Sequence, residues 1–249
     1  MSNTLALFIT FLLGVFILIG TIISFFIKKQ DKVLDFIFAF ALSLLSMLII
    51  IDLLPEIIEH LGITYIYLFL LFGMLGLLAF KVIDDFVPLH EDHKLTKKEV
   101  KKNYVHIGLL ATIALIIHNI VEGMAIYLSA CNDISLGLVM SIGVGLHNIP
   151  LGIIITTTLR VSDAKSKDYV ILLGSLFLSS FVGGLIPYLL NLNTVSDTVI
   201  GSLLSLTLGM LLYIIIFELW PKVVKTKNKK ITIIGLISGV ILLLLSLLI

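Results

Sequence analysis

Residues 104–159 read YVHIGLLATIALIIHNIVEGMAIYLSACNDISLGLVMSIGVGLHNIPLGIIITTTL, and this stretch decides the fold class. It contains two long, mostly apolar runs, 104–128 and 134–159, which a short polar connection separates. An α-helix of about 20 apolar residues crosses the roughly 30 Å hydrocarbon core of a bilayer. Each run is therefore long enough to span a membrane, and the short connection makes the two predicted helices antiparallel neighbours.

The rest of the chain repeats this pattern. Of 249 residues, 59% are hydrophobic and 13% are charged, a composition typical of membrane proteins and not of soluble domains. Eight apolar stretches are long enough to span a bilayer, and they lie at about 4–27, 33–54, 63–87, 104–128, 134–159, 169–190, 198–220 and 231–249. We therefore predict an all-α membrane protein with eight transmembrane helices in a single domain over residues 1–249. The first stretch lacks the features of a cleaved signal, so we expect it to remain as a span.

The basic residues predict how the chain is oriented in the membrane. All lysine and arginine residues except Lys81 lie in the first, third, fifth and seventh loops between these stretches. Basic residues that flank membrane spans stay on the cytoplasmic side. We therefore expect these loops, including the third at 89–103, to be cytoplasmic and both termini to face outward. The chain would lie in a plasma membrane or a bacterial inner membrane.

Charge and cysteine content exclude other classes of function. The net charge of +1 gives no reason to expect a nucleic-acid partner, so the expected surroundings are the lipid bilayer. The single cysteine, Cys131, excludes an internal disulfide framework and a multi-thiolate zinc site within one chain. Any metal ligands must therefore be histidine, aspartate, glutamate or asparagine side chains.

Polar side chains stand in the middle of both runs of the opening stretch. Residues 118–123 read HNIVEG and residues 147–152 read HNIPLG, each near the centre of its predicted span. An ionisable side chain at this depth costs several kcal/mol unless it is paired or solvated. His118 and Glu122 lie one helical turn apart on one face, and His147 lies at a similar depth in the antiparallel neighbour. Two imidazoles and one carboxylate can therefore converge on one metal ion.

Neighbouring residues support a metal site. Asn119 and Asn148 each follow a histidine, and they can supply neutral oxygen ligands or orient the imidazoles. Pro150 frees the backbone carbonyl of Leu146. The same polar groups could instead hydrogen-bond between helices without binding an ion, but two matched His-Asn pairs and Glu122 at one depth favour the metal site. Imidazole ligands suit zinc, iron, cobalt or nickel better than magnesium or calcium.

The two hexapeptides resemble the paired HNxPEG signatures of the ZIP (Zrt/Irt-like) family of divalent-metal transporters, particularly its bacterial zinc-uptake branch. The similarity extends to the ends of three other stretches, which read IDLLPE at 51–56, DDFVPLHEDH at 84–93 and FELWP at 217–221. The resemblance implies a bundle of eight spans with both termini outside, in agreement with the positions of the lysines. It also implies uptake of divalent metal ions into the cytoplasm, above all zinc, with iron, manganese, cobalt and cadmium as further candidates, and no prosthetic group. Small residues such as Gly183 and Gly184 are compatible with a homodimer.

Two departures from the family pattern affect the predicted site. Val121 stands where the family usually has proline, and Leu151 stands where it usually has a bridging glutamate. The resemblance implies two metal ions in some members, which draw another carboxylate from the sixth span, but residues 169–196 of this chain contain no acidic residue. We therefore expect a single centre. Its predicted ligands are His118, Glu122 and His147, completed by Asn119, Asn148 or water. Leu151 follows His147 by one turn, so we expect it on the face that meets the metal.

Two other groups of polar residues lie near the ends of the stretches. Asp52, Glu56, Glu59 and His60 follow the apolar part of the second stretch, where they either gather cations at an entrance or form a solvated helix end. Asp84 follows Lys81 by about one helical turn, which predicts an ion pair on the surface of one helix.

Three functions compete on these observations. The first is a metal carrier with alternating access, in which the fourth and fifth spans hold the ion. The second is an intramembrane zinc hydrolase, because two histidines, one carboxylate and an open position also form a catalytic zinc site. No further acid, base or oxyanion donor completes such a site, so we do not expect an enzyme. The third is a metal-binding homologue that has lost transport, which only Leu151 supports.

Overall fold

The computed structural model describes residues 2–27, 31–86, 97–161, 166–192, 194–226 and 228–246, and these ranges contain helices and connections but no strand. The uninterrupted helices are α1 (Ser2–Phe25), α4 (Ile66–Phe86), α5 (Lys97–Asn132), α6 (Ile134–Val161), α7 (Ser166–Leu189) and α10 (Lys229–Ser246). Two longer segments each contain a π-helical turn. They run as α2 (Asp31–Leu48), η1 (Ile49–Leu53) and α3 (Leu54–Leu61), and as α8 (Asp197–Tyr213), η2 (Ile214–Leu219) and α9 (Trp220–Lys225). The all-α prediction is confirmed.

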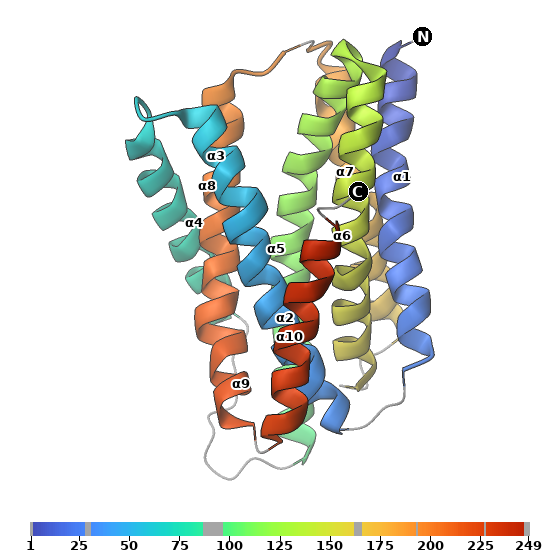
Figure 1. Cartoon of the computed structure of the whole chain (residues 1–249), viewed down its shortest axis with the longest axis vertical. Coiled ribbons are helices and arrows are strands. Elements are labelled where there is room, and N and C mark those ends of the chain that lie inside the picture. Colours follow the sequence, from blue (N-terminus) through green and yellow to red (C-terminus); the bar gives the residue numbers. More distant parts are fainter. Residues whose placement is uncertain are drawn as a thin grey trace.

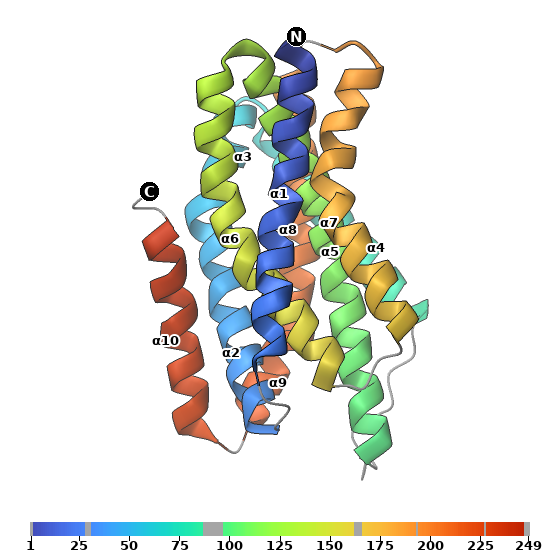
Figure 2. The ribbon, with the colours of Figure 1, turned by 90° about the vertical axis from the view of Figure 1, so that its right-hand side faces the viewer.

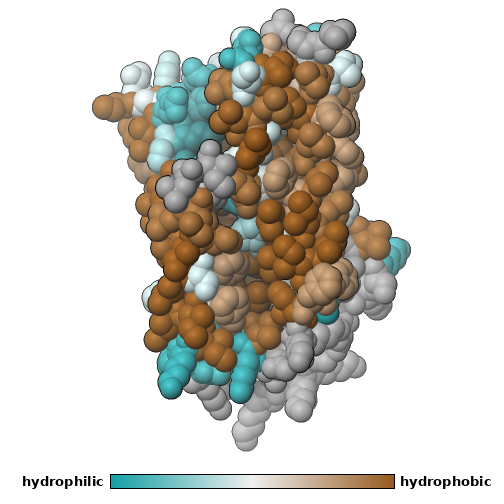
Figure 3. Space-filling view, turned by 45° about the vertical axis from the view of Figure 1, so that its right-hand side comes forward, coloured by the Kyte–Doolittle hydropathy of each residue, from teal (hydrophilic) through white to brown (hydrophobic). Residues whose placement is uncertain are grey.

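The lengths and surfaces of these helices are those of a multi-pass membrane protein. Seven helical segments in the described ranges are long and apolar enough to cross a bilayer. They correspond to the first seven predicted spans, and the eighth corresponds to the shorter helix α10, with residues 247–249 outside the described ranges. Figure 3 shows an apolar surface over the middle of the molecule and hydrophilic residues at its two ends. Such an apolar belt fits a lipid environment.

Two helices continue beyond the predicted spans. α5 begins at Lys97, so residues 97–103 of the predicted cytoplasmic loop 89–103 are helical, and residues 89–96 lie outside the described ranges. Lysine and glutamate are good helix formers, so they continue the helix beyond the apolar part. The second span likewise runs past residue 54 to Leu61. Pro55 lies in the first turn of α3, directly after the π turn, where a helix tolerates a residue without an N–H group.

The helices form two groups. The first helix group consists of α1, α5, α6 and α7, which pack against one another as a four-helix bundle (Figure 2). The second helix group consists of α2 to α4 and α8 to α10, in which α2 lies beside α10 and α4 lies beside α8 (Figure 1). Contacts between the two groups are fewer, and they run mainly between α5 and α8 and between α2 and α6.

Glycines bring neighbouring helix backbones into direct contact within each group. A Cβ atom on Gly183 of α7 would lie 2.0 Å from the carbonyl oxygen of Ile120 on α5. In the second group, a Cβ atom on Gly76 of α4 would lie 2.0 Å from the carbonyl oxygen of Leu206 on α8. None of the described glycines makes such an approach between the groups. Small residues allow membrane helices to pack closely, so each group is held by backbone contact while the groups meet through side chains.

The close approach at Gly183 gives a stability prediction. Gly183→Ala should destabilise the protein by about 1–3 kcal/mol, because the added methyl group has no space beside the carbonyl of Ile120. Gly174 is the matched control on the same helix, since nothing lies within 4 Å of its added Cβ. Gly174→Ala should leave stability unchanged or raise it by up to about 1 kcal/mol through better helix propensity. Thermal unfolding of the purified variants tests this, and equal stability of the two would contradict it.

Candidate metal centre

Three ionisable side chains from α5 and α6 meet inside the first helix group. His118 Nε2 lies 2.9 Å from Glu122 Oε1 on the same helix, and His147 Nε2 lies 3.2 Å from the same oxygen atom. The centroids of the two imidazole rings are 6.5 Å apart. The structure therefore brings together the three side chains whose convergence the two hexapeptides predict.

The connection between α5 and α6 accounts for this arrangement. α5 ends at Asn132 and α6 begins at Ile134, so a single residue, Asp133, separates the helices. The backbone N–H of Ser135 donates a hydrogen bond of 2.8 Å to Asp133 Oδ1, which satisfies a donor at the start of α6. Such a short connection forces the two helices to run antiparallel and in contact. Pro150 lies within α6 and does not end it.

The three side chains are almost fully buried, and His118 and Glu122 are incompletely hydrogen-bonded. The exposed fractions of His118, Glu122 and His147 are 1%, 4% and 7%. Glu122 Oε2 and His118 Nδ1 have no hydrogen-bond partner among the described residues, and neither do the amide atoms of the buried residues Asn119 and Asn148. Most buried polar atoms in proteins are paired, and an unpaired one costs about 1–3 kcal/mol. The unpaired atoms of Glu122 and His118 are therefore the ones for which a bound ligand would offer partners.

The donor set is suited to one transition-metal ion. Zinc ligand atoms lie about 2.0–2.2 Å from the ion. Glu122 Oε1 lies 2.9 Å and 3.2 Å from the two imidazole nitrogens, separations that ligands of one such ion can have. Two imidazoles and one carboxylate favour zinc and its neighbours over magnesium and calcium. Asn119 and Asn148 make no hydrogen bond to the three donors among the described residues, so their part in the site stays a prediction.

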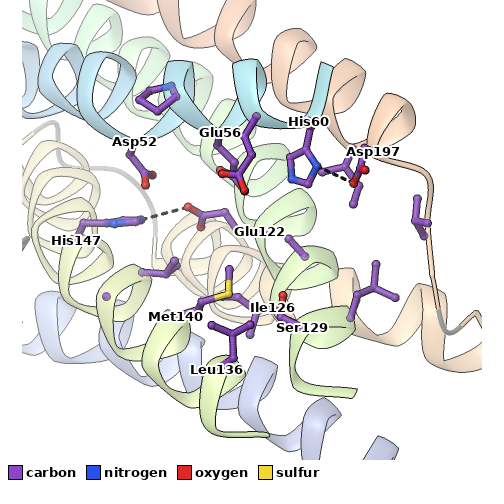
Figure 4. Close-up of a pocket in the computed structure, with 18 of the residues that line it drawn as sticks. Asp52, Glu56, His60, Glu122, Ile126, Ser129, Leu136, Met140, His147 and Asp197 are labelled. Carbon is purple, nitrogen blue, oxygen red and sulfur yellow. Dashed lines mark hydrogen bonds and ion pairs between the residues drawn. The ribbon is translucent and has the colours of Figure 1, made fainter. Parts of the chain in front are cut away.

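A cavity of about 800 Å³ connects two of the three donors, Glu122 and His147, with one end of the molecule. Glu122 and His147 line its inner part, and Asp52 and Glu56 line its wall (Figure 4). At its rim, His60 Nδ1 lies 3.1 Å from Asp197 Oδ1, where α3 meets the start of α8. The acidic residues of the second span therefore face the route to the site.

Apolar side chains close the opposite side of the centre. A second, much smaller cavity lies between α2, α5 and α6, and no charged residue is among the described residues that line it. Leu151 belongs to this lining together with Leu45 of α2 and Leu115 of α5, and it is 3% exposed. The position where the family usually carries glutamate thus adjoins an apolar barrier, and Leu151 is not among the residues that line the larger cavity.

A second polar cluster lies near the other end of the helices. Oδ1 of Asp84 on α4 lies 2.6 Å from Nε2 of His106 on α5. The Tyr213 hydroxyl donates a hydrogen bond of 2.6 Å to Oδ2 of Asp84. Glu218 of η2 is 5% exposed. Together with Asp84 and His106 it forms a group of three residues whose side chains can bind metal ions. The predicted ion pair between Asp84 and Lys81 is wrong, because Asp84 is bound by groups from other helices. The signal in the sequence was an ionisable residue near the start of the fourth apolar stretch, His106.

A π-helical turn carries an acidic residue in the wall of the larger cavity and another in the second cluster. Asp52 lies in η1 and Glu218 lies in η2, and each is followed three residues later by a proline, Pro55 or Pro221. A π turn inserts an extra residue into a helix and is frequent at functional sites. It changes which face of the helix the following residues occupy, and periodicity arguments do not predict it.

The unpaired asparagines give a prediction about stability. Asn148→Leu should leave the metal-free protein as stable or raise its stability, because the change removes a buried amide without a partner. Thr156→Val is the matched control on the same helix, since the Thr156 hydroxyl donates a 3.1 Å hydrogen bond to Thr21. Its loss should cost about 1 kcal/mol. If chemical unfolding shows Asn148→Leu to be the more destabilising change, the Asn148 side chain has a structural role.

Comparisons with known proteins complete the description of the site. A family model described as "ZIP Zinc transporter" matches residues 88–247. The chain is 28% identical over 279 aligned positions to the zinc transporter ZupT of Clostridium perfringens (strain 13 / Type A), an alignment that covers 100% of this chain and 97% of that protein. It is 24% identical over 219 positions to the zinc transporter ZupT of Enterobacter sp. (strain 638), with 86% of this chain and 85% of that protein covered.

Proposed function

Because this chain belongs to the ZIP family of zinc transporters, whose model matches more than half of it, we propose that it moves zinc across the membrane through the centre of His118, Glu122 and His147. The chain is a multi-pass membrane transporter of divalent metal ions and not an enzyme. Zinc is its substrate, and no prosthetic group is implied. The observation that carries the proposed site is the group of three buried donors with unpaired atoms beside an open cavity.

The chemistry of the donors supports transport over permanent storage. In the group of three, one carboxylate offsets only half of the charge of a divalent ion, and the imidazoles are neutral ligands. A carrier needs an ion to leave as well as to enter, so moderate binding is an advantage. Asn119, Asn148 or water would complete the coordination.

Alternation of an open and a closed side would move the ion. The cavity is open on the side of Asp52 and Glu56, whereas the apolar residues around Leu151 close the other side. Basic residues of the seventh loop, such as Lys225 and Lys229, lie at the end of the molecule where α9 ends and α10 begins. By the positive-inside rule, this end faces the cytoplasm. We therefore infer eight spans with both termini outside, a cavity open to the exterior, and uptake into the cytoplasm.

The other transition metals remain within the proposal. Iron, manganese, cobalt and cadmium accept the same donor types in varying degree, so a comparison of fluxes is needed to rank them against zinc. The competing proposal is a homologue that binds metal without transport. It is supported by Leu151, since the family usually has a carboxylate at that position.

The orientation can be tested by labelling from outside. In intact cells, a membrane-impermeant thiol reagent should label Asn132→Cys in a Cys131→Ser background, because Asn132 is exposed at the predicted outer end. Lys229→Cys, exposed at the other end, is the matched control and should react only after the membrane is permeabilised. The reverse pattern would overturn the proposed direction of the chain.

Metal uptake by purified protein in liposomes tests the function. The parent should show saturable zinc flux, whereas His118→Ala, Glu122→Gln and His147→Ala should abolish it, because each change removes one of the three donors. Even the loss of a group that only supports a metal ligand lowers metal affinity or activity by about 10- to 100-fold. His60→Ala is the matched control, since His60 lines the rim of the same cavity, and its effect should be small. Normal flux in folded His118→Ala would disprove the site, and zinc binding without flux in the parent would favour the transport-deficient homologue.

A further inference from the structure

A hydrogen bond joins the two helix groups on the side of the molecule where the apolar residues close the route. Nε2 of His106, on α5 of the first helix group, lies 2.6 Å from Oδ1 of Asp84, on α4 of the second. His106 is 4% exposed, so the contact is shielded from solvent. The hydrogen bond between Thr156 and Thr21 also connects two helices, but both of them belong to the first group. The contact of His106 with Asp84 must therefore break when the groups separate on this side.

The second helix group holds the carboxylate of Asp84 in place for this contact. The Tyr213 hydroxyl of α8 donates a hydrogen bond of 2.6 Å to Oδ2 of Asp84. The Tyr213 ring in turn packs on Phe80 of α4 and Phe217 of η2, with ring centroids 6.0 Å and 4.8 Å apart. Asp84 therefore keeps a partner from its own group when His106 leaves, so separation does not leave its carboxylate without a hydrogen bond.

The other nitrogen of the His106 ring makes the contact easier to reverse. His106 Nδ1 is buried and has no hydrogen-bond partner among the described residues. A buried polar atom without a partner costs free energy, and water would supply a partner if this side opened. One nitrogen of the ring thus stabilises the closed arrangement, whereas the other favours its opening.

The position of the contact links it to the metal centre. Ile107, directly after His106, and Leu219 of η2 both line the smaller apolar cavity that adjoins the closed side. α5 is one unbroken helix that carries both His106 and Glu122. A movement of the metal donors relative to the second helix group therefore also moves His106 relative to Asp84.

We propose that His106 and Asp84 form a latch that keeps this side of the transporter closed and that opens each time an ion leaves the centre toward it. The inference rests on the proposed transport of zinc by alternation. Both are positioning residues, because they act through the relative placement of the two helix groups. Hydrogen bonds to a carboxylate are stronger than those between neutral groups, so the latch favours the form whose larger cavity is open. Its loss shifts the population toward the form that is open on the other side.

Thiol labelling of the closed side tests the latch without zinc. In a Cys131→Ser background, Ala111→Cys places a thiol in the lining of the smaller cavity, at a position that is 8% exposed. This variant, purified in lipid nanodiscs, should react slowly with a water-soluble maleimide. Adding His106→Ala or Asp84→Asn should raise the rate by about 10- to 100-fold, as expected for loss of a hydrogen bond to a charged group. Thr156→Val is the matched control, since it removes a buried hydrogen bond within the first group, and it should leave the rate unchanged.

A thiol in the larger cavity distinguishes the latch from a general loosening of the fold. Ala125→Cys lines that cavity, and its labelling rate should stay the same or fall when His106→Ala is added, because the two sides open in turn. An unchanged rate at Ala111→Cys, or a rise at both thiols, overturns the latch. A rise at Ala111→Cys alone supports it. Absence of saturable zinc flux in the parent overturns the proposed function, whereas normal flux with unchanged labelling at Ala111→Cys rejects the latch alone.

Discussion

A carboxylate that is buried at membrane depth must be compensated by nearby groups, because hydrocarbon cannot solvate its charge. Glu122 meets this constraint with His118 at 2.9 Å and His147 at 3.2 Å, and the surrounding helices are arranged so that these distances are reached. Each hexapeptide also ends in a glycine whose backbone packs on a neighbouring helix. A Cβ atom would lie 2.0 Å from Ser180 O at Gly123 and 2.4 Å from Ile17 O at Gly152. The same short motif therefore supplies the polar donors on one face and the close packing that holds them on another.

Close backbone contacts lie within each helix group, whereas the two groups meet through side chains, some of them polar. Within each helix group, glycines allow the backbones to touch, and such interfaces have little room to rearrange. The second polar cluster instead contains residues of both groups, because His106 of the first group meets Asp84 and Tyr213 of the second. The cavity also lies between the groups, with Glu122 and His147 of the first and Asp52 and Glu56 of the second in its lining. Side-chain hydrogen bonds can break and form again with less rearrangement than close backbone packing. The contacts between the two helix groups can therefore change more easily than the contacts within each group.

The sequence predicts this architecture where the physical signal is local. Apolar length predicts the spans, and the one-turn spacing of His118 and Glu122, with a short connection to His147, predicts the group of three donors. The structure differs where the signal is not local. Asp84 pairs with His106 across a segment that contains the third loop, and no spacing rule connects them. Asp52 lies within a helix although the apolar pattern ends close to it, because helix continuation beyond Pro55 depends on the π turn. Which helix backbone each glycine contacts likewise depends on how the helices pack, and the order of the helices in the chain does not predict it.

The π turn of the second span also affects how sequences of related transporters should be compared. One extra residue turns the part of the helix after η1 by roughly 100° relative to an unbroken α-helix. The part before η1, α2, packs against α10, whereas the part after it, α3, packs against α8. The two halves thus follow separate registers, and a relative with a regular α-helix here would need one residue fewer to keep both sets of contacts. An alignment gap inside this transmembrane helix, ordinarily a sign of error, would then mark a true structural correspondence, and forcing the helix to align without it would displace Asp52 from its counterparts.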